Sequence, residues 1–285
     1  MFGINSFGIV GGDKRQLYCA KSIADDGFNT VVTGFDTDKA MGLKICSLEE
    51  CAAHSDAFIL PLPVTDKNGN ITTQLFSDII AADKKTAALF EDKPIFCGMS
   101  SRLHRCEGFE RLKIYDYSMR EEFAVNNAVP TAEGALEIAM RLYDGTICHA
   151  RCLVAGYGRI GKILSKMLFG LGADVTVSAR KLSDLAYIEA LGMKPIETEH
   201  LSGHFDLIFN TVPSLIFDAH ILAKVASKAI VIDLASYPGG VDFEAAKRMN
   251  IRAFWALSLP GKAAPMTAGK IIKNAVYNIA REERL

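Results

Sequence analysis

The sequence has almost no net charge and little that would attract a polyanion. Its 32 Lys and Arg residues are matched by 33 Asp and Glu residues, which leaves a formal net charge of −1 at pH 7. Proteins that hold phosphate backbones carry a clear excess of basic residues on one face. We therefore expect no nucleic acid among the partners of this chain.

Apolar runs long enough to cross a membrane are absent as well. Segments such as 57–64 and 229–235 have the length of buried strands, far short of the roughly 18 residues that span a bilayer. The first residues, MFGINSFGIVGGDKRQ, lack the charged start, apolar centre and cleavage site of a signal peptide. The sequence therefore predicts a cytoplasmic protein with no membrane partner.

Short motifs of metal binding and nucleophilic catalysis are missing too. The seven cysteines form no C-x-x-C pair and have no histidine cluster beside them, so no metal site is expected. Buried structural thiols are the favoured interpretation, with a redox or metal role as the alternative. The chain also has no G-x-S-x-G, H-E-x-x-H or P-loop, so none of these motifs identifies its chemistry.

What the sequence does contain is a twofold alternation of strand-length apolar segments with helical segments. In the first half, strands are expected at 6–12, 28–35, 56–63, 94–99 and 112–117, and helices at 14–27, which Asp13 would cap, and 72–89. In the second half, strands are expected near 150–155, 174–178, 206–210, 229–234 and 251–254, and helices near 159–171, 182–191, 218–226 and 242–249. A last helix is expected at 265–285. This alternation predicts an α/β fold with two doubly wound parallel-sheet domains.

One glycine pattern indicates a ligand. Gly156, Gly158 and Gly161 form G-x-G-x-x-G directly after an apolar strand and at the start of an apolar-periodic helix. In such a strand–turn–helix unit the first glycine permits the tight turn, the second admits a pyrophosphate, and the third lets the helix approach the sheet. The helix N-terminus then offers N–H groups and a partial positive charge. The second domain is therefore predicted to be a Rossmann dinucleotide-binding domain, with an unliganded glycine turn as the alternative.

The residues after the next strand select the cofactor. Ser178, Arg180 and Lys181 stand where an NAD site has a carboxylate for the ribose, and Asp174 lies at the other end of that strand. Guanidinium and ammonium groups suit the 2′-phosphate of NADP. NADP is therefore expected rather than NAD, and a solvated basic pair is the alternative. The predicted cofactor-binding residues are Gly156, Tyr157, Gly158, Arg159, Ile160, Gly161, Ser178, Ala179, Arg180, Lys181, Asn210, Thr211, Val212, Pro213, Asp233, Leu234, Ala235 and Ser236.

These segments suggest a domain plan. Residues 1–126 would form a flavodoxin- or Rossmann-like substrate domain and 127–145 an interdomain helix that starts after Pro130, with Thr131 as a candidate cap. Residues 146–262 would bind NAD(P), and 263–285 would form the C-terminal helix. Ligands of such proteins bind beyond the carboxyl ends of the strands, so the cleft between the domains is the expected substrate site.

Polar residues in strand-end loops and in the interdomain segment are the candidates for substrate binding and catalysis. Hydride transfer depends on orientation more than on an activated nucleophile, so the absence of nucleophile motifs is compatible with a dehydrogenase. For Ser100 and Ser101 the alternative role is to cap a helix over the segment RLHRCEGF. The candidate residues are Ser100, Ser101, Arg102, Asn127, Thr131, Glu133 and Lys262.

Longer blocks of the sequence resemble one family. GGDKRQL, FILPLPVTDKNGNI, FCGMSSRL, NAVPTAEGALEIAM, GYGRIGKILSKMLFGLGADVTVSARK and IDLASYPGGVDFEAAK, followed by RAFWALSLPGKAAPMTAGKII, are similar to the A subunits of dipicolinate synthase. These blocks extend over residues 11–272. More distantly, the layout resembles formate/glycerate dehydrogenases and adenosylhomocysteinase, in which the last helix returns to the first domain. The Arg–Glu–His arrangement of 2-hydroxyacid dehydrogenases is not evident here, which argues against a hydroxyacid substrate.

The resemblance implies a function. The family acts in sporulating Firmicutes, in the mother cell, and oxidises dihydrodipicolinate to dipicolinate (pyridine-2,6-dicarboxylate) together with a flavoprotein-like B subunit. In that setting Arg102, Ser100 and Ser101 and, on the other domain, Lys262 would bind the two carboxylates, while Asn127, Thr131 and Glu133 would position the ring or carry a proton. A homo-oligomer is expected.

Two other functions stay open at this point. One is a hydrolase-like or isomerising enzyme that keeps a bound cofactor, by analogy with adenosylhomocysteinase. The other is a non-catalytic subunit that binds nucleotide and substrate for a redox-active partner. Fold alone does not distinguish them.

Overall fold

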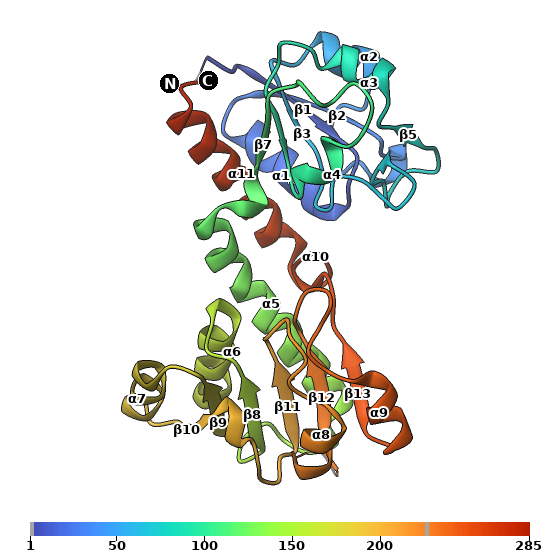
Figure 1. Ribbon diagram of the computed structural model, residues 1–285. Helices are drawn as coiled ribbons and strands as arrows, with labels where there is room; N and C mark the ends of the chain where they lie inside the picture. Colours follow the sequence, from blue (N-terminus) through green and yellow to red (C-terminus); the bar gives the residue numbers. More distant parts are fainter. Residues whose placement is uncertain (1–2, 226–227) are drawn as a thin grey trace. The chain divides into compact units, whose positions relative to one another are not determined.

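We describe the chain from a computed structural model that covers residues 3–225 and 228–285 (Figure 1). The chain divides into two compact units. Unit 1 comprises Met1–Asn127 and Ala264–Leu285, and unit 2 comprises Ala128–Ala263. Each unit has its own parallel sheet and buries its own apolar core.

Unit 1 is organised around a five-stranded parallel sheet with the order β2-β1-β3-β6-β7. Its strands are β1 (Ser6–Val10), β2 (Asn29–Thr33), β3 (Ala57–Ile59), β6 (Ile95–Cys97) and β7 (Ile114–Asp116). The connections contain α1 (Lys14–Asp25), α2 (Leu48–Ala53), α3 (Lys84–Leu89), α4 (Ser100–Leu103), short helices at Thr37–Lys39 and Tyr117–Met119, and the antiparallel pair β4 (Asn70–Ile71) and β5 (Ile80–Ala81). The central strands β1 and β3 are buried along their whole lengths, as expected for a sheet covered on both faces.

The first turn of α1 is determined by the residues that follow β1. The carboxylate of Asp13 accepts a hydrogen bond from the backbone N–H of Arg15 at 2.8 Å. In return, the backbone N–H of Asp13 donates to Oε1 of Gln16 at 3.1 Å. This reciprocal capping box satisfies N–H groups that the helix itself leaves unpaired, and it confirms the helix start expected at Asp13.

The C-terminal helix α11 (Pro265–Glu282) belongs to unit 1 and packs along α1. Its buried side chains, among them Ile272 and Val276, join the same core as Leu17 and Ile23 of α1. At one end of the contact, Nζ of Lys273 donates to the carboxylate of Asp26 at 2.7 Å. The expected return of the last helix to the first sheet is therefore confirmed.

Unit 2 contains a six-stranded parallel sheet with the order β10-β9-β8-β11-β12-β13. Its strands are β8 (Arg151–Ala155), β9 (Asp174–Ala179), β10 (Lys194–Glu197), β11 (Leu207–Asn210), β12 (Ile230–Asp233) and β13 (Arg252–Trp255). Its helices are α6 (Arg159–Gly170), α7 (Leu182–Ala190), a short helix at Thr198–His200, α8 (Ala219–Val225), α9 (Phe243–Arg248) and α10 (Leu259–Ala263). The helix α5 (Glu121–Leu142) begins in unit 1 and continues into unit 2.

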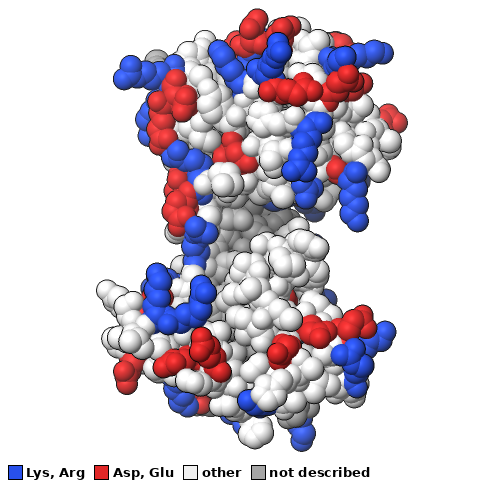
Figure 2. Space-filling view, viewed as in Figure 1, with Lys and Arg blue, Asp and Glu red and all other residues white. Residues whose placement is uncertain are grey.

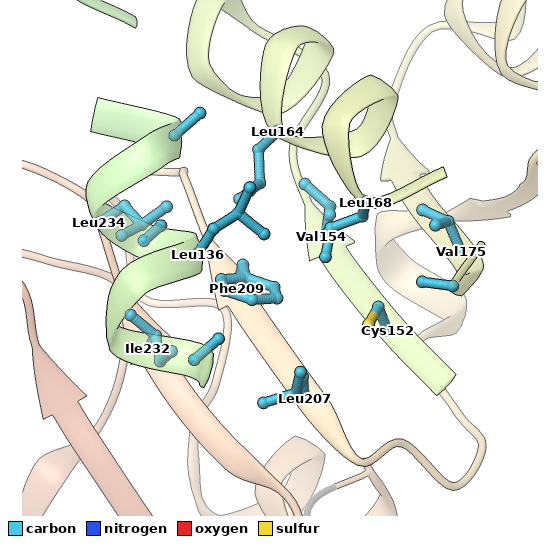
Figure 3. Close-up of a cluster of buried hydrophobic side chains, with 14 of the residues drawn as sticks. Leu136, Cys152, Val154, Leu164, Leu168, Val175, Leu207, Phe209, Ile232 and Leu234 are labelled. Atoms are coloured by element: carbon cyan, nitrogen blue, oxygen red, sulfur yellow. The ribbon is translucent and has the colours of Figure 1, made fainter. Parts of the chain in front are cut away.

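Figure 3 shows the main core of unit 2, where α5 and α6 cover one face of the sheet. Leu136 of α5 and Leu164 and Leu168 of α6 point toward Val154 and Phe209 of the central strands. All five side chains are buried, so this layer is held by the apolar stripe of each helix. The predicted α/β class with two parallel sheets is therefore confirmed. No helix in the described ranges is long and apolar enough to cross a membrane.

One local prediction and one alternative are wrong, and one strand was not expected. The helix expected at 72–89 is only Lys84–Leu89, because Asp83 accepts from the N–H of Thr86 and starts a helix there, after the β4–β5 pair. Serines 100 and 101 do not cap a helix over RLHRCEGF: α4 ends at Leu103, and its N-cap is Met99 with φ +64° and no side-chain bond. Strand β10, at the sheet edge, was not expected because its sequence KPIE is mostly polar and exposed.

The helix expected to start after Pro130 instead starts nine residues before Pro130, at Glu121, and Pro130 lies inside it. Thr131 is therefore not the helix cap. A proline removes one helical N–H and strains the preceding turn, but acidic side chains in the first turn favour the earlier start. Beyond the proline, Ala132, Ala135 and Leu136 are buried in the core of unit 2, and this packing stabilises the continued helix.

Replacing Gly269 by alanine should destabilise unit 1. A Cβ at this position would lie 2.6 Å from the carbonyl oxygen of Arg15 and 2.7 Å from the backbone nitrogen of Cys19. Overpacking of this kind costs about 1–3 kcal/mol, and it opposes the gain of about 1 kcal/mol in helix propensity. Urea unfolding of Gly269→Ala should therefore show a lower midpoint. Gly170→Ala is the control, because a Cβ there meets no atom within 4 Å; an equal change in both variants would contradict the packing argument.

Candidate cofactor and substrate sites

Both sheets reverse their strand order at the centre, and the candidate sites lie at these reversals. In unit 2 the chain runs outward from β8 through β9 to β10, then returns to β11 on the other side of β8. Loops at the carboxyl ends of two such strands diverge, and ligands of open α/β sheets bind there. The glycine turn follows β8, and Thr211 follows β11.

The three glycines of the turn have different surroundings. Gly156 has φ +98°, and a Cβ on it would lie 2.5 Å from Oγ1 of Thr211. A Cβ on Gly161 would lie only 2.1 Å from the carbonyl oxygen of Gly156. These two glycines are therefore required by the fold. Gly158 is different, because a Cβ there would meet no atom within 4 Å.

The open space at Gly158 adjoins the N-terminus of α6. Gly158 is the N-cap, makes no side-chain cap, and no acidic residue lies in the first turn. Backbone N–H groups and the helix dipole at such an end favour phosphate. The residues present therefore fit the pyrophosphate of a dinucleotide, as predicted for the glycine turn.

Ser178 does not lie where the sequence suggested. It is fully buried, and its Oγ accepts hydrogen bonds from the N–H of Gly156 at 3.3 Å and from the hydroxyl of Thr198 at 3.3 Å. It thus supports the glycine turn from inside the sheet. Arg180 and Lys181 follow the end of β9 and are exposed.

The electrostatics around the turn are mixed. Asp174 starts β9 and binds Lys194 at 2.7 Å, so its carboxylate lies at the opposite end of the strand from Arg180. Nζ of Lys162 lies 5.3 Å from the ring centroid of Tyr157. The pKa of Tyr157 is raised, first by burial and then by the carboxylate of Asp184. Figure 2 shows Lys and Arg side chains gathered over the part of unit 2 where α6 and α7 lie in Figure 1.

The loops after β11 and β12 are tied together by a buried Asn–Asp pair. Nδ2 of Asn210 donates to the carboxylate of Asp233 at 2.7 Å and to the carbonyl of Val212 at 3.0 Å. The same carboxylate accepts from the N–H groups of Ala235 at 3.0 Å and Gly240 at 2.8 Å. Both side chains are fully buried. In this structure, therefore, Asn210 and Asp233 shape the loops without being exposed to a ligand.

The other predicted residues of these loops differ in exposure. Oγ1 of Thr211 donates to the carbonyl of Ala155 at 2.8 Å and so joins the two central strands. Leu234 and Ala235 are buried, whereas Pro213 and Ser236 are exposed. The structure adds one residue that sequence reasoning missed. Nε1 of Trp255, the only tryptophan, donates to the carbonyl of Ala235 at 2.9 Å, a pairing across two strands that no local motif indicates.

The predicted substrate residues of unit 1 follow β6. The backbone N–H of Ser100 donates to the carboxylate of Asp116 at 2.7 Å, so this helix end already has an anion of the chain itself. Nη1 of Arg102 donates to the carbonyl of Thr65 at 3.2 Å. Ser101 and Arg102 are exposed. Since α4 has only four residues, it supplies no helix dipole for a carboxylate.

The remaining candidates lie on α5 and α10. Asn127 belongs to unit 1, whereas Thr131, Glu133 and Lys262 belong to unit 2. Thr131 is buried, and Glu133 and Lys262 are exposed. The two helices pack together in unit 2, since a Cβ on Gly134 would lie 3.0 Å from Cβ of Leu259. Glu133 and Lys262 are thus carried by neighbouring helices.

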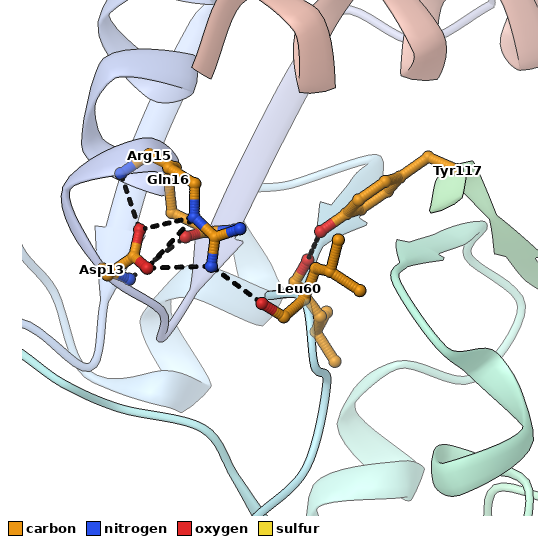
Figure 4. A network of polar contacts seen from close by, with 6 residues as sticks. Asp13, Arg15, Gln16, Leu60 and Tyr117 are labelled. Carbon is orange, nitrogen blue, oxygen red and sulfur yellow. Dashed lines mark hydrogen bonds and ion pairs between the residues drawn. The ribbon is translucent and has the colours of Figure 1, made fainter. Parts of the chain in front are cut away.

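Sequence reasoning missed a polar cluster at the strand-order reversal of unit 1, where β1 and β3 are neighbours (Figure 4). Nε and Nη2 of Arg15 donate to the carboxylate of Asp13 at 3.0 Å and 2.8 Å, and Nη2 also donates to the carbonyl of Leu62 at 2.8 Å. The hydroxyl of Tyr117 donates to the carbonyl of Leu60 at 3.0 Å. Burial works to lower the pKa of Arg15, but Asp13 more than offsets it, so the pKa is raised.

One member of this cluster is incompletely bonded. Gln16 is fully buried, and its Nε2 has no hydrogen-bond partner in the part of the chain that the structure describes. An enclosed donor without an acceptor costs about 1–3 kcal/mol. The sequence signal that could have found the cluster is GGDKRQ, which places an acid, a base and an amide directly after the first strand.

The cysteines lie mainly in the interior. Cys19, Cys51, Cys97 and Cys152 are buried, and Cys148 is exposed. Burial raises the pKa of Cys19, Cys51 and Cys152 to about 12, which keeps these thiols protonated near neutral pH. Among the residues that the structure describes, no group of three or more His, Cys, Asp or Glu side chains could hold a metal ion.

The two parallel sheets and the glycine turn define a dehydrogenase-like fold. The structure superposes on D-lactate dehydrogenase from Escherichia coli with a TM-score of 0.59 over 98% of this chain and 96% of that one, at 13% identity. A likeness at this identity concerns the fold alone.

Closer relatives identify the family. The chain is 32% identical over 283 residues to the A subunit of dipicolinate synthase from Bacillus subtilis (strain 168), covering 96% of this chain and 95% of that one. The dipicolinate synthase A subunit from Bacillus halodurans superposes with a TM-score of 0.86 at 31% identity, over 97% of each chain. Residues 6–117 match the family model of the N-terminal domain of the dipicolinate synthase A subunit. The chain belongs to the family of dipicolinate synthase A subunits, which confirms the resemblance found in the sequence.

Substitutions at two glycines of the turn should have different effects, one on dinucleotide binding and the other on stability. Gly158→Val places a side chain in open space and should leave the free energy of unfolding within about 1 kcal/mol of wild type, the range of an altered cap. It should weaken dinucleotide binding at least tenfold by titration, because the pyrophosphate needs close approach to the backbone. Gly161→Ala should instead destabilise unit 2, since its Cβ meets the carbonyl of Gly156. Unchanged dinucleotide affinity in Gly158→Val would remove the turn as the binding site.

Proposed function

We propose that the chain acts as the A subunit of a dipicolinate synthase and oxidises dihydrodipicolinate to dipicolinate with NADP. The observation that carries the proposal is the open glycine cradle at Gly158, beside an uncapped helix end and at the strand-order reversal of the sheet. Membership in the family supports the proposed reaction. We assign unit 2 to the nucleotide and unit 1 to the substrate.

NADP is the favoured cofactor because the residues that directly follow β9 in the chain carry no carboxylate. The strand is followed by the exposed residues Arg180 and Lys181, and the nearest acid in the chain after it is Asp184 in the first turn of α7. A guanidinium pairs with two phosphate oxygens at once, and an ammonium adds a point charge.

For this reaction the protein has to bind the substrate and the nucleotide and orient them relative to each other. The dihydropyridine loses a hydride and a proton and becomes aromatic, so the product itself favours the reaction. Bound NADP would accept the hydride. The chain would hold the pyrophosphate at α6, keep the loops after β11 and β12 in place through Asp233 and Asn210, and position the diacid. Among the predicted residues, Glu133 is an exposed carboxylate and a candidate acceptor for the proton.

A second polypeptide belongs to the same proposal. The relative from B. subtilis is named as the A subunit of its synthase, and we propose that a flavoprotein-like B subunit is the partner of this chain. We also propose a homo-oligomer, and action in the cytoplasm of the mother cell during sporulation.

The decisive experiment follows absorbance at 340 nm after dihydrodipicolinate is mixed with NADP and the purified chain. Formation of NADPH by this chain alone supports the proposal, and formation only when the B subunit is present assigns the reaction to the pair. No NADPH under either condition, with dinucleotide binding intact, would favour a non-catalytic nucleotide-binding subunit.

The choice of NADP over NAD should depend on Arg180. Arg180→Ala should raise the Kd for NADP about tenfold, which corresponds to about 1.4 kcal/mol, because a charge-assisted bond to the 2′-phosphate is lost. The Kd for NAD should stay within about twofold, an expectation set by the absence of that phosphate. Lys224→Ala, which removes an exposed positive charge from α8, is the control. A parallel loss of NAD and NADP binding would contradict the assignment.

A further inference from the structure

We propose that Arg15 and Gln16, in the first turn of α1, form a carboxylate-binding site of unit 1. The site would take one carboxylate of a small organic acid. It deepens the proposed function, and rests on it, because that function supplies the dicarboxylate used as the probe.

The position is the first argument. In unit 1 the chain runs from β1 to β2 on one side of the sheet and then returns to β3 on the other side of β1. The carboxyl ends of β1 and β3 therefore form the strand-order reversal, where ligands of such sheets bind. Arg15 lies just after β1, and its partner carbonyl at Leu62 lies just after β3. The earlier candidates at Ser100–Arg102 follow β6, one strand farther along the sheet.

The unused donors are the second argument. All the hydrogen bonds of the Arg15 side chain are made by Nε and Nη2, to Asp13 and Leu62. Its other terminal nitrogen, Nη1, makes none within the described chain, and the side chain is 10% exposed. In Figure 4 the guanidinium lies between Asp13 and the strand-end carbonyls. Gln16 holds the N–H of Asp13 with Oε1, so the same amide carries Nε2 as a second unused donor close to the helix start.

Enclosed side-chain atoms without a hydrogen bond are found mainly near the turn between β1 and α1. Within residues 3–225 and 228–285, three enclosed side-chain atoms lack a hydrogen bond: Nε2 of Gln16, Oγ1 of Thr72 and Oγ of Ser55. Thr72 is adjacent to the turn that leads into α1, because its carbonyl accepts from the N–H of Gly12 at 2.7 Å. Thr72 and Gln16, which carry two of these three atoms, therefore both contact the turn at Gly12. Enclosed polar groups are nearly always paired in folded proteins, so a cluster of unpaired ones indicates a missing acceptor.

The chemistry of the donors favours a carboxylate over a phosphate. The N-terminus of α1 is closed by the capping box of Asp13 and Gln16, so its backbone N–H groups are not free to surround a phosphate. What remains is one guanidinium nitrogen and one amide nitrogen, and N–H donors of both kinds bind carboxylate oxygens. The carboxamide is enclosed in this structure, so binding requires the turn to admit one oxygen of the ligand.

The test uses pyridine-2,6-dicarboxylate as the probe and isothermal titration of the full chain. In Gln16→Glu the new side chain still accepts from the N–H of Asp13, as glutamate does in a capping box, but it loses both N–H donors and repels an anion. Its Kd for the probe should rise at least tenfold, while its Kd for NADP stays close to wild type; its thermal midpoint should fall, because the new carboxylate is enclosed beside Asp13. Gln74→Glu, the same change at an exposed position beside the Gly12 turn, is the control and should change the Kd for the probe less than threefold.

Arg15→Lys is the second variant, and it tests the proposed carboxylate site if Gln16→Glu does not fold. It keeps the charge but loses the planar fork, and the Kd for the probe should again rise at least tenfold. Unchanged probe affinity in a folded variant at either position would overturn the site. The proposed function is tested separately: a wild-type chain that forms NADPH and variants with unaltered KM for dihydrodipicolinate would refute only the site. A wild-type chain that binds the probe through Gln16 but never forms NADPH would refute only the reaction.

Discussion

The reversal of strand order at the centre of each sheet is the constraint on which the rest of this chain depends. In unit 2 it brings the glycine turn after β8 next to Thr211 after β11, and in unit 1 it brings the Asp13 turn after β1 next to the Leu60–Leu62 segment after β3. At such a pair the connections leave in opposite directions, so the strand ends are not covered by a crossover. Backbone groups and helix N-termini are therefore available for ligands at these two places.

An aspartate organises the strand-end loops of each sheet, but the two are bonded differently: Asp233, at the end of β12, is fully buried, whereas Asp13, after β1, is partly exposed. Asp233 accepts from an asparagine amide and two backbone N–H groups, and this network is complete. Asp13 binds Arg15 and caps α1, yet the neighbouring amide of Gln16 keeps an enclosed donor that has no partner within residues 3–225 and 228–285. A complete network stabilises loops around a ligand, whereas an incomplete one costs stability until an acceptor arrives. This difference is the reason for assigning binding to the cluster in unit 1 and support to the pair in unit 2.

Much of the architecture could be predicted from local patterns. The alternation of apolar strands and amphipathic helices indicated two parallel sheets, and the glycine spacing located a turn whose two tightest glycines are packed against Thr211 and the Gly156 carbonyl. The capping signal at Asp13 was also confirmed. These features depend on a few residues that are close in sequence, so periodicity and turn chemistry are enough to find them.

The sequence by itself determined the α/β class, the family and the turn that would hold a dinucleotide. Each of these can be recognised from residues that are close together in the chain. Tertiary structure decided which polar residues are exposed to a ligand. Ser178, Asn210 and Asp233 lie at the ends of predicted strands but are enclosed by hydrogen bonds to distant segments. Only the folded chain shows that Pro130 lies inside a helix, or that Nε2 of the buried Gln16 has no hydrogen-bond partner among the described residues. Burial and pairing arise from contacts between residues far apart in the chain, and no local pattern encodes them.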